Sequence, residues 1–137
     1  KVPFELQISV FEKQLELAEK FKKPVVIHCV AAFQEIIAIK KKRDIKVPMI
    51  IHGFAKNNQL AQQLITAGFY LSFGKYLLKN PDLETVFQNV PNDRFFLETD
   101  TIEESILQVY ELASKYKSLN IKELQNVISS NYKSVFE

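Results

Sequence analysis

Apolar residues recur along the chain with two alternating periods, one typical of helices and one typical of buried strands. Spacings of three and four residues, which place side chains on one face of a helix, occupy residues 4–21, 32–42, 57–67, 82–88, 102–117 and 121–136. Short, nearly continuous apolar runs occupy residues 24–28, 47–52, 69–73 and 94–97. Such runs suit parallel strands that are covered on both faces. The pattern therefore predicts an α/β fold in a single unit.

The helical spacing also predicts which positions face the core. Large side chains that we expect to be buried in this way include Phe21, Ile106, Tyr132 and Phe136. Gly68 is suited to end the helix before it, because glycine readily adopts a left-handed conformation. Between Gly74 and Pro81 we expect a loop.

Three ionisable residues stand where predicted strands stop. His28 ends the run PVVIH, His52 ends PMIIH, and Asp100 ends RFFLETD, whereas the strand in GFYLSFG ends without an ionisable group. Helical crossovers make such strands parallel, so their C-terminal ends share one edge of the sheet. We therefore expect His28, His52 and Asp100 to converge there, with Glu98 on the same face as Asp100.

Two histidines and a carboxylate at one edge favour a metal site. Imidazole nitrogen and carboxylate oxygen are ordinary ligands of zinc, manganese and related ions. A metal held in this way lowers the pKa of a bound water, and a nearby aspartate can accept its proton. A single histidine at a strand end is more often a hydrogen-bonded structural residue. Since His28 and His52 are the only histidines and occupy equivalent positions, both interpretations stay open on the residues alone.

Composition limits the classes of protein that this chain can belong to. Its 137 residues, 47% of them hydrophobic, suffice for one domain with a core. A net charge of +2 implies no global attraction to nucleic acid or membrane, and the basic run from Lys40 to Arg43 is expected at a helix C-terminus. One cysteine, no long apolar span and no signal sequence favour a cytoplasmic protein without a membrane partner. The chain begins with Lys1 rather than methionine, as expected of a fragment or a processed product.

Four motifs together resemble one known family. PVVIHC, IHGF, GFYLSFG and RFFLETD, in this order and at these separations, look like the second half of the TatD-related metal-dependent deoxyribonucleases, a branch of the amidohydrolase-like barrels. The resemblance covers nearly the whole chain. It implies a parallel (β/α) fold of the TIM-barrel type, in which residues 1–137 form a single unit that supplies roughly the last four strands and helices of an eight-stranded barrel.

The resemblance also implies a site and a reaction. His28 and His52 would hold one metal of a two-metal centre of Mg, Mn or Zn, and Asp100 would bind the other metal and help to activate the attacking water. Because Glu98 shares a face with Asp100, we also expect it to be a hydrogen-bond partner of these ligands. The implied activity is hydrolysis of phosphodiester bonds in DNA by metal-activated water.

Some features of the family are missing from this sequence. It lacks the family's His-x-His pair and the bridging glutamate. Three possibilities stay open: the chain pairs with an absent N-terminal half-barrel, it pairs with a second copy of itself, or it is a stable remnant whose parent is the enzyme. A basic residue often found two positions after the first histidine is Val30 here. Lys56 and Lys75 remain candidates for binding phosphate. Alternatives to a nuclease are a non-catalytic half-barrel that serves as an interaction domain, and an amidohydrolase-like enzyme acting on a small ester or amide.

Overall fold

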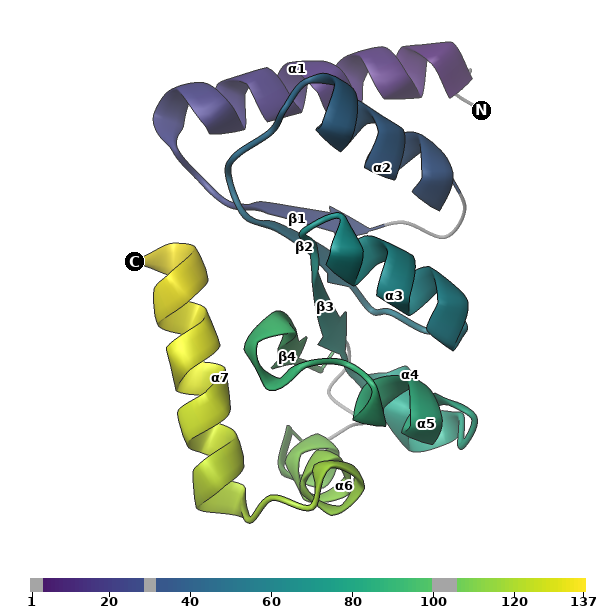
Figure 1. The fold of residues 1–137 in the computed structure, drawn as a ribbon, viewed down its shortest axis with the longest axis vertical. Coiled ribbons are helices and arrows are strands. Elements are labelled where there is room, and N and C mark those ends of the chain that lie inside the picture. Colours follow the sequence, from purple (N-terminus) through teal and green to yellow (C-terminus); the bar gives the residue numbers. More distant parts are fainter. Residues whose placement is uncertain (1–3, 29–31, 100–105) are drawn as a thin grey trace.

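The computed structural model describes residues 4–28, 32–99 and 106–137. Its elements, in chain order, are α1 (Phe4–Phe21), β1 (Val25–His28), α2 (Phe33–Lys42), β2 (Met49–His52), α3 (Asn58–Thr66), β3 (Tyr70–Phe73), α4 (Lys75–Lys79), α5 (Leu83–Gln88), the 3-10 helix η1 (Asn92–Arg94), β4 (Phe95–Leu97), α6 (Ile106–Lys117) and α7 (Ile121–Phe136). The four strands form one parallel sheet in the order β1-β2-β3-β4. Figure 1 shows the helices following one another around this sheet, from α1 to α7. The predicted parallel α/β class is confirmed.

The core lies between the sheet and the helices. Strand side chains that point into it are almost fully buried, and they include Ile27, Met49, Ile51, Leu71, Phe73 and Phe95. A series of edge-to-face phenylalanine contacts crosses this layer, with ring centroids 5.8 Å apart for Phe54 and Phe73, 5.0 Å for Phe73 and Phe87, and 4.9 Å for Phe87 and Phe95. Closely packed aromatic side chains therefore lie on the helical side of the sheet, opposite the face that carries the histidines.

The other face of the sheet is less covered. Side chains alternate along a strand, so Val26, Tyr70 and Phe96 point away from the helical core. Val26 is 59% exposed. The Tyr70 and Phe96 rings lie 5.8 Å apart, and the Arg94 guanidinium lies 4.9 Å from the centre of the Tyr70 ring. This face is the one on which the histidines stand.

Four residues that the helical spacing placed in the core are exposed instead. Phe21 is 60% exposed, because it is turned well away from Leu15 on the buried side of α1. Tyr132 and Phe136 are 52% and 43% exposed, since they pack on each other at the less covered face, where Phe136 also contacts Phe96. Ile106, at 45%, is the first residue of α6.

The segment between Gly74 and Pro81 is also different from the prediction. Instead of a loop, residues 75–79 form the short helix α4. Its buried residue, Leu77, is 1% exposed, and the Leu77 amide donates to the Gly74 carbonyl at 2.9 Å. Burial of this one leucine against the helical layer stabilises a turn too short to show a helical period.

The last helix is tied to the sheet by a buried asparagine. Asn131 is 3% exposed, and its amide nitrogen donates to the carbonyls of Asn92 at 2.8 Å and Phe95 at 2.9 Å. At the other end of α7, Asn120 and Glu123 form a reciprocal capping box. The hydrogen bonds of Asn131 hold α7 against η1 and β4, whereas the capping box stabilises the start of the helix itself.

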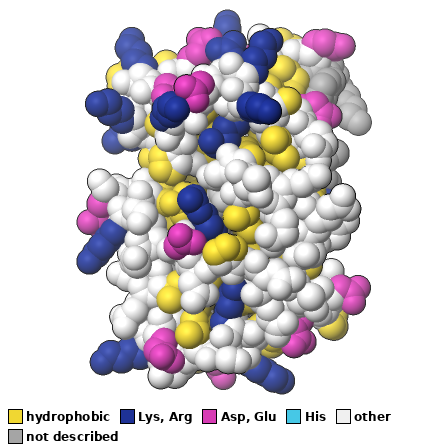
Figure 2. Space-filling view, in the orientation of Figure 1, with side chains coloured by type: hydrophobic (Ala, Val, Ile, Leu, Met, Phe, Trp, Pro, Cys, Tyr) yellow, Lys and Arg dark blue, Asp and Glu magenta, His cyan; other side chains and the backbone are white. Residues whose placement is uncertain are grey.

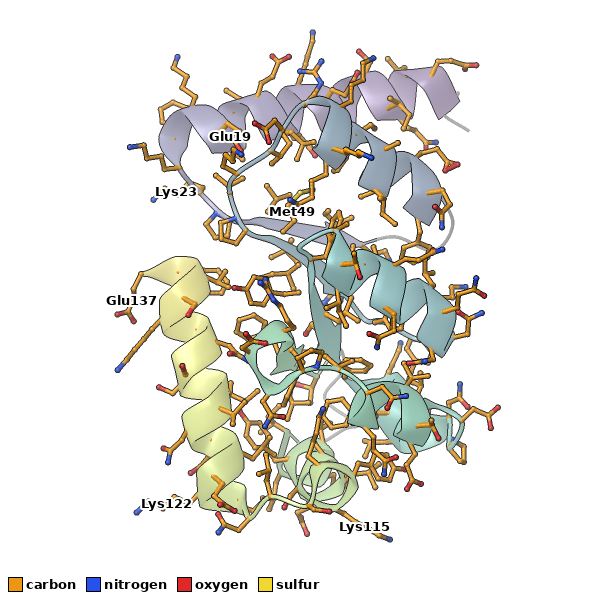
Figure 3. The ribbon with its side chains drawn as sticks, in the orientation of Figure 1. Glu19, Lys23, Met49, Lys115, Lys122 and Glu137 are labelled. Atoms are coloured by element: carbon orange, nitrogen blue, oxygen red, sulfur yellow. The ribbon has the colours of Figure 1, made fainter. Side chains whose placement is uncertain are left out.

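Basic residues gather on α1 and α2, as the upper part of Figure 2 shows. Within this group Arg43 binds Glu12 at 3.0 Å and Glu16 at 2.9 Å, which joins the two helices. Figure 3 shows Glu19 reaching from α1 toward the segment before β2, where its carboxylate accepts from the amides of Lys46 and, at 3.0 Å, Val47. Arg43 and Glu19 therefore tie α1 to the segment between α2 and β2.

Lys117, at the end of α6, is half-buried. Its ammonium lies 5.0 Å from the centre of the Phe87 ring and 5.3 Å from that of Phe95, and it donates to the carbonyls of Gln88 and Val90. Burial lowers the pKa of Lys117 to about 8.

Among the described residues, no helix is long and apolar enough to cross a membrane.

Candidate metal site at the carboxyl edge of the sheet

The two histidines lie side by side where β1 and β2 end. They are direct partners in the parallel register of these strands, and their ring centroids are 5.5 Å apart. An imidazole nitrogen binds zinc at about 2 Å, so two ring centres on one ion lie roughly 3 Å from it and at most about 6 Å apart. The pair His28 and His52 is within this limit, and its nitrogen donors suit zinc or manganese. The structure thus brings together two of the residues that the sequence singled out.

The third predicted ligand, Asp100, lies outside the described residues, as does Val30. Within residues 4–28, 32–99 and 106–137, no group of three His, Cys, Asp or Glu side chains could hold a metal ion. The described part of the chain therefore offers two neighbouring imidazoles, and a complete site needs further ligands.

Glu98 connects the histidine pair to the rest of the sheet. Its Oε2 lies 2.8 Å from Nδ1 of His52 and also accepts a hydrogen bond from the Ser72 hydroxyl. The Glu98 side chain is 17% exposed and that of His52 is 30% exposed. Because an ionised carboxylate can only accept, this contact favours the neutral tautomer of His52 that has its proton on Nδ1 and its lone pair on Nε2. That tautomer is the one in which Nε2 can bind a metal.

The absence of a side chain at Gly74 leaves room for Glu98 to reach across β3 to β2. A Cβ atom at Gly74 would lie 2.8 Å from the Glu98 carbonyl oxygen and 2.9 Å from its Cγ, which is closer than side chains tolerate. Gly53 has φ +64°, a left-handed conformation that favours glycine, and it lies beside Oε1 of Glu98. Neither Ser72 nor the two glycines stood out as site residues in the sequence, although GFYLSFG places Ser72 near a strand end.

A cavity of about 260 Å³ opens beside the two histidines. Its other walls include Phe33, Lys56 and Tyr76, of which Tyr76 is 41% exposed. Lys75, the other candidate for phosphate binding, does not line the cavity, and its ammonium lies 5.2 Å from the centre of the Tyr76 ring. A larger groove of about 840 Å³ lies between α2 and α3, with neither histidine on its walls. The cavity at the strand ends is thus the one that adjoins the candidate ligands.

The fold and this site define a class of protein: a parallel α/β protein with histidines at the carboxyl edge of its sheet, where such folds place their active sites. The sequence profile described as "TatD related DNase" matches residues 1–137. The chain belongs to this family.

Relatives and solved structures agree with this assignment. A Bacillus subtilis (strain 168) protein named uncharacterized metal-dependent hydrolase YabD is 29% identical over 152 residues, which cover 99% of this chain and 60% of that protein. The protein of Escherichia coli (strain K12) named uncharacterized metal-dependent hydrolase YcfH is 25% identical over 146 residues, which cover 95% of this chain and 55% of that protein. The chain therefore spans little more than half the length of the curated relatives it matches.

Two solved structures share the fold. The TatD homologue YJJV of Escherichia coli k12 superposes with a TM-score of 0.88 at 20% identity, over 97% of this chain and 57% of that one. A hydrolase TatD family protein from Entamoeba histolytica superposes with a TM-score of 0.84 at 16% identity, over 97% and 57% of the two chains. The predicted TIM-barrel type of fold is confirmed by these neighbours, and the division of the barrel into this unit and an absent half stays a prediction.

Proposed function

We propose that the protein containing this chain is a metal-dependent hydrolase that cleaves phosphodiester bonds of DNA. The observation that carries the proposal is the pair of neighbouring imidazoles at the carboxyl edge, in a chain of the TatD-related family. His28 and His52 would hold one divalent metal, and Asp100 would bind a second one, drawn from Mg, Mn or Zn. A metal bound there would supply a water of lowered pKa and stabilise the phosphoryl oxygens.

The chain's own residues have separate roles in the proposed reaction. The attacking water forms a bond to phosphorus, and the bond from phosphorus to one sugar oxygen breaks, its electron pair leaving with that oxygen, which takes up a proton from solvent. Asp100 accepts the proton of the water and is the proposed catalytic base. Glu98 orients His52 through the hydrogen bond at Nδ1. Lys56, on the wall of the cavity, contacts a phosphate of the strand, with Lys75 as a second phosphate contact next to Tyr76.

The test is cleavage of end-labelled DNA by the full-length protein with Mn²⁺, Mg²⁺ or Zn²⁺. We expect cleavage that a chelator abolishes and that Asp100→Asn lowers by about 10²-fold or more, as expected for loss of a general base. Asp93→Asn, the same change at an exposed position in η1, should leave the rate unaltered. A protein that degrades no DNA with any of these metals contradicts the proposal. Hydrolysis of small esters or amides without cleavage of DNA would instead identify an amidohydrolase-like enzyme.

We also propose that an N-terminal half-barrel covers the less protected face of the sheet. Both edge strands, β1 and β4, lack a second neighbour among the described strands, and Val26 on β1 is 59% exposed. On α1, four exposed apolar residues share a second face of the helix: Leu6, Val10, Leu17 and Phe21. The expected result is that the 137-residue chain alone self-associates in sedimentation and the full-length protein does not. A monomeric chain that binds a partner protein but cleaves nothing would favour the interaction domain.

A further inference from the structure

We propose that Ser72 is a positioning residue for the metal site, acting through Glu98 on His52. This inference rests on the proposed role of His52 as a metal ligand. The three side chains come from the ends of three adjacent strands: His52 ends β2, Ser72 is in β3, and Glu98 directly follows β4. They form one connected hydrogen-bonded group, in which the hydroxyl of Ser72 and Nδ1 of His52 both donate to Oε2 of Glu98.

The backbone holds these three residues at fixed positions. The Ser72 carbonyl accepts from the Phe54 amide at 2.9 Å, and the Glu98 amide donates to the Phe73 carbonyl at 2.9 Å. These two bonds continue the parallel pairing past the ends of β2 and β4. Ser72 is 4% exposed, so its hydroxyl is enclosed and directed at the carboxylate. Neither Ser72 nor Glu98 can move far without breaking the sheet.

The carboxylate of Glu98 receives few donors for a group so enclosed. Its other oxygen, Oε1, is buried and has no hydrogen-bond partner among the residues that the structure describes. Both donors therefore act on Oε2, and one of them is Ser72. Removing a donor from a buried carboxylate is costly, because the lost contact is not replaced by water. Without Ser72, the position of Oε2 would depend on His52 alone.

Loss of the hydrogen bond from Ser72 to Glu98 would affect the imidazole of His52. A fixed Oε2 selects the tautomer with the proton on Nδ1 and sets the orientation of the ring. A loosely held carboxylate selects neither, so a fraction of His52 would adopt the tautomer with the proton on Nε2, in which that nitrogen cannot bind a metal. Loss of contacts that orient metal ligands typically lowers metal affinity about 10- to 100-fold. We expect a loss of this size for Ser72→Ala.

The experiment measures the tautomer and the affinity separately in the full-length protein. Histidine labelled with ¹⁵N reports which ring nitrogen carries the proton, and His28→Asn assigns the signals of the two histidines of this chain. Isothermal titration with Zn²⁺ alone gives the affinity. Variants are Ser72→Ala, Ser72→Thr and, as a matched control, Ser114→Ala. This control removes a serine hydroxyl of α6 that donates to the carbonyl of Leu119, just after that helix.

We expect a single tautomer of His52 with the proton on Nδ1 in the wild-type protein and a mixture in Ser72→Ala. Ser72→Thr, which keeps the hydroxyl, should restore both the tautomer and the affinity, and Ser114→Ala should change neither. If Ser72→Ala does not fold by circular dichroism, the thiol of Ser72→Cys, a weak donor of similar size, should give the same mixture.

The possible results separate this inference from the proposed function. A single unchanged tautomer and an unchanged Zn²⁺ affinity in folded Ser72→Ala would overturn the role of Ser72. Equal effects of Ser72→Ala and Ser114→Ala would also overturn it, because the disturbance would then be general. If the wild-type protein binds no metal while Ser72→Ala still alters the tautomer, the metal-dependent function fails and the positioning role of Ser72 stands.

Discussion

Asn131→Asp should strongly destabilise the protein, although it changes neither the size nor the shape of the side chain. The amide nitrogen of Asn131 donates to two carbonyl oxygens, of Asn92 and Phe95, inside the protein. An ionised carboxylate cannot donate, so both hydrogen bonds are lost at a cost of about 1 kcal/mol each. The two carbonyl oxygens would also face a buried negative charge, because the side chain at position 131 is only 3% exposed in the wild-type protein. Leaving such groups unpaired adds about 1–3 kcal/mol, so the total should be about 3–5 kcal/mol.

The assay is urea unfolding followed by far-UV circular dichroism at pH 7. The same change at the start of the same helix, Asn120→Asp, is the matched control. Asn120 accepts a hydrogen bond from the Glu123 amide at 2.8 Å, and a carboxylate accepts equally well at a helix N-cap. We expect Asn120→Asp to remain within about 0.5 kcal/mol of the wild-type protein.

Lowering the pH provides an internal check on this reasoning. A protonated carboxyl group regains one donor, so the deficit of Asn131→Asp should shrink as the pH falls from 7 toward 4. The capping carboxylate of Asn120→Asp gains nothing from protonation. If Asn131→Asp is as stable as Asn120→Asp at pH 7, the two hydrogen bonds of Asn131 do not hold α7 against β4.

Three other substitutions test separate contacts. Gly74→Ala should lower the free energy of unfolding by about 1–3 kcal/mol, because its Cβ would collide with Glu98; an unchanged urea midpoint would mean that the strand end yields easily. Burial lowers the pKa of Lys117 to about 8, so above that pH the unfolded chain holds a proton that the native state has released. The free energy of unfolding of the wild-type protein should therefore rise relative to that of Lys117→Met between about pH 8 and 10. If urea unfolding gives the same difference between the two proteins at each pH in this range, the prediction is wrong. In Glu19→Ala the amides of residues 46 and 47 should exchange hydrogen faster, and unaltered exchange by NMR would show that the carboxylate does not protect them.

The sequence was sufficient to predict the sheet and the neighbouring histidines. Pro24 and Pro48 start two apolar runs of similar length that end in His28 and His52. Since consecutive parallel strands pair in the same direction, equal lengths bring the two ends to the same height. This inference needs only the period of the pattern and the direction of the crossovers.

Contacts between distant segments could not be predicted in this way. Glu98 was expected at this edge from the alternation of strand side chains. Its hydrogen bond to His52, however, depends on how far a side chain reaches across β3, where Gly74 leaves room. The exposure of Phe21 and Phe136 was missed for a related reason. A helical spacing shows that a face is apolar, whereas only the three-dimensional arrangement shows which apolar face meets the sheet.

Because the strands pair in their chain order, the candidate site forms only when all four strands pair in the correct register. Among the residues that the structure describes, each strand pairs only with its neighbours in the chain. Each of four successive strand ends contributes one polar side chain to the edge: His28, His52, Ser72 and Glu98. A slip of one residue between two strands would turn the side chains of one strand to the opposite face and separate these groups. Misregistered forms of the chain could keep much of their helix content and still lack the hydrogen-bonded group. The tautomer of His52 would thus distinguish native protein from compact misfolded forms that circular dichroism does not resolve.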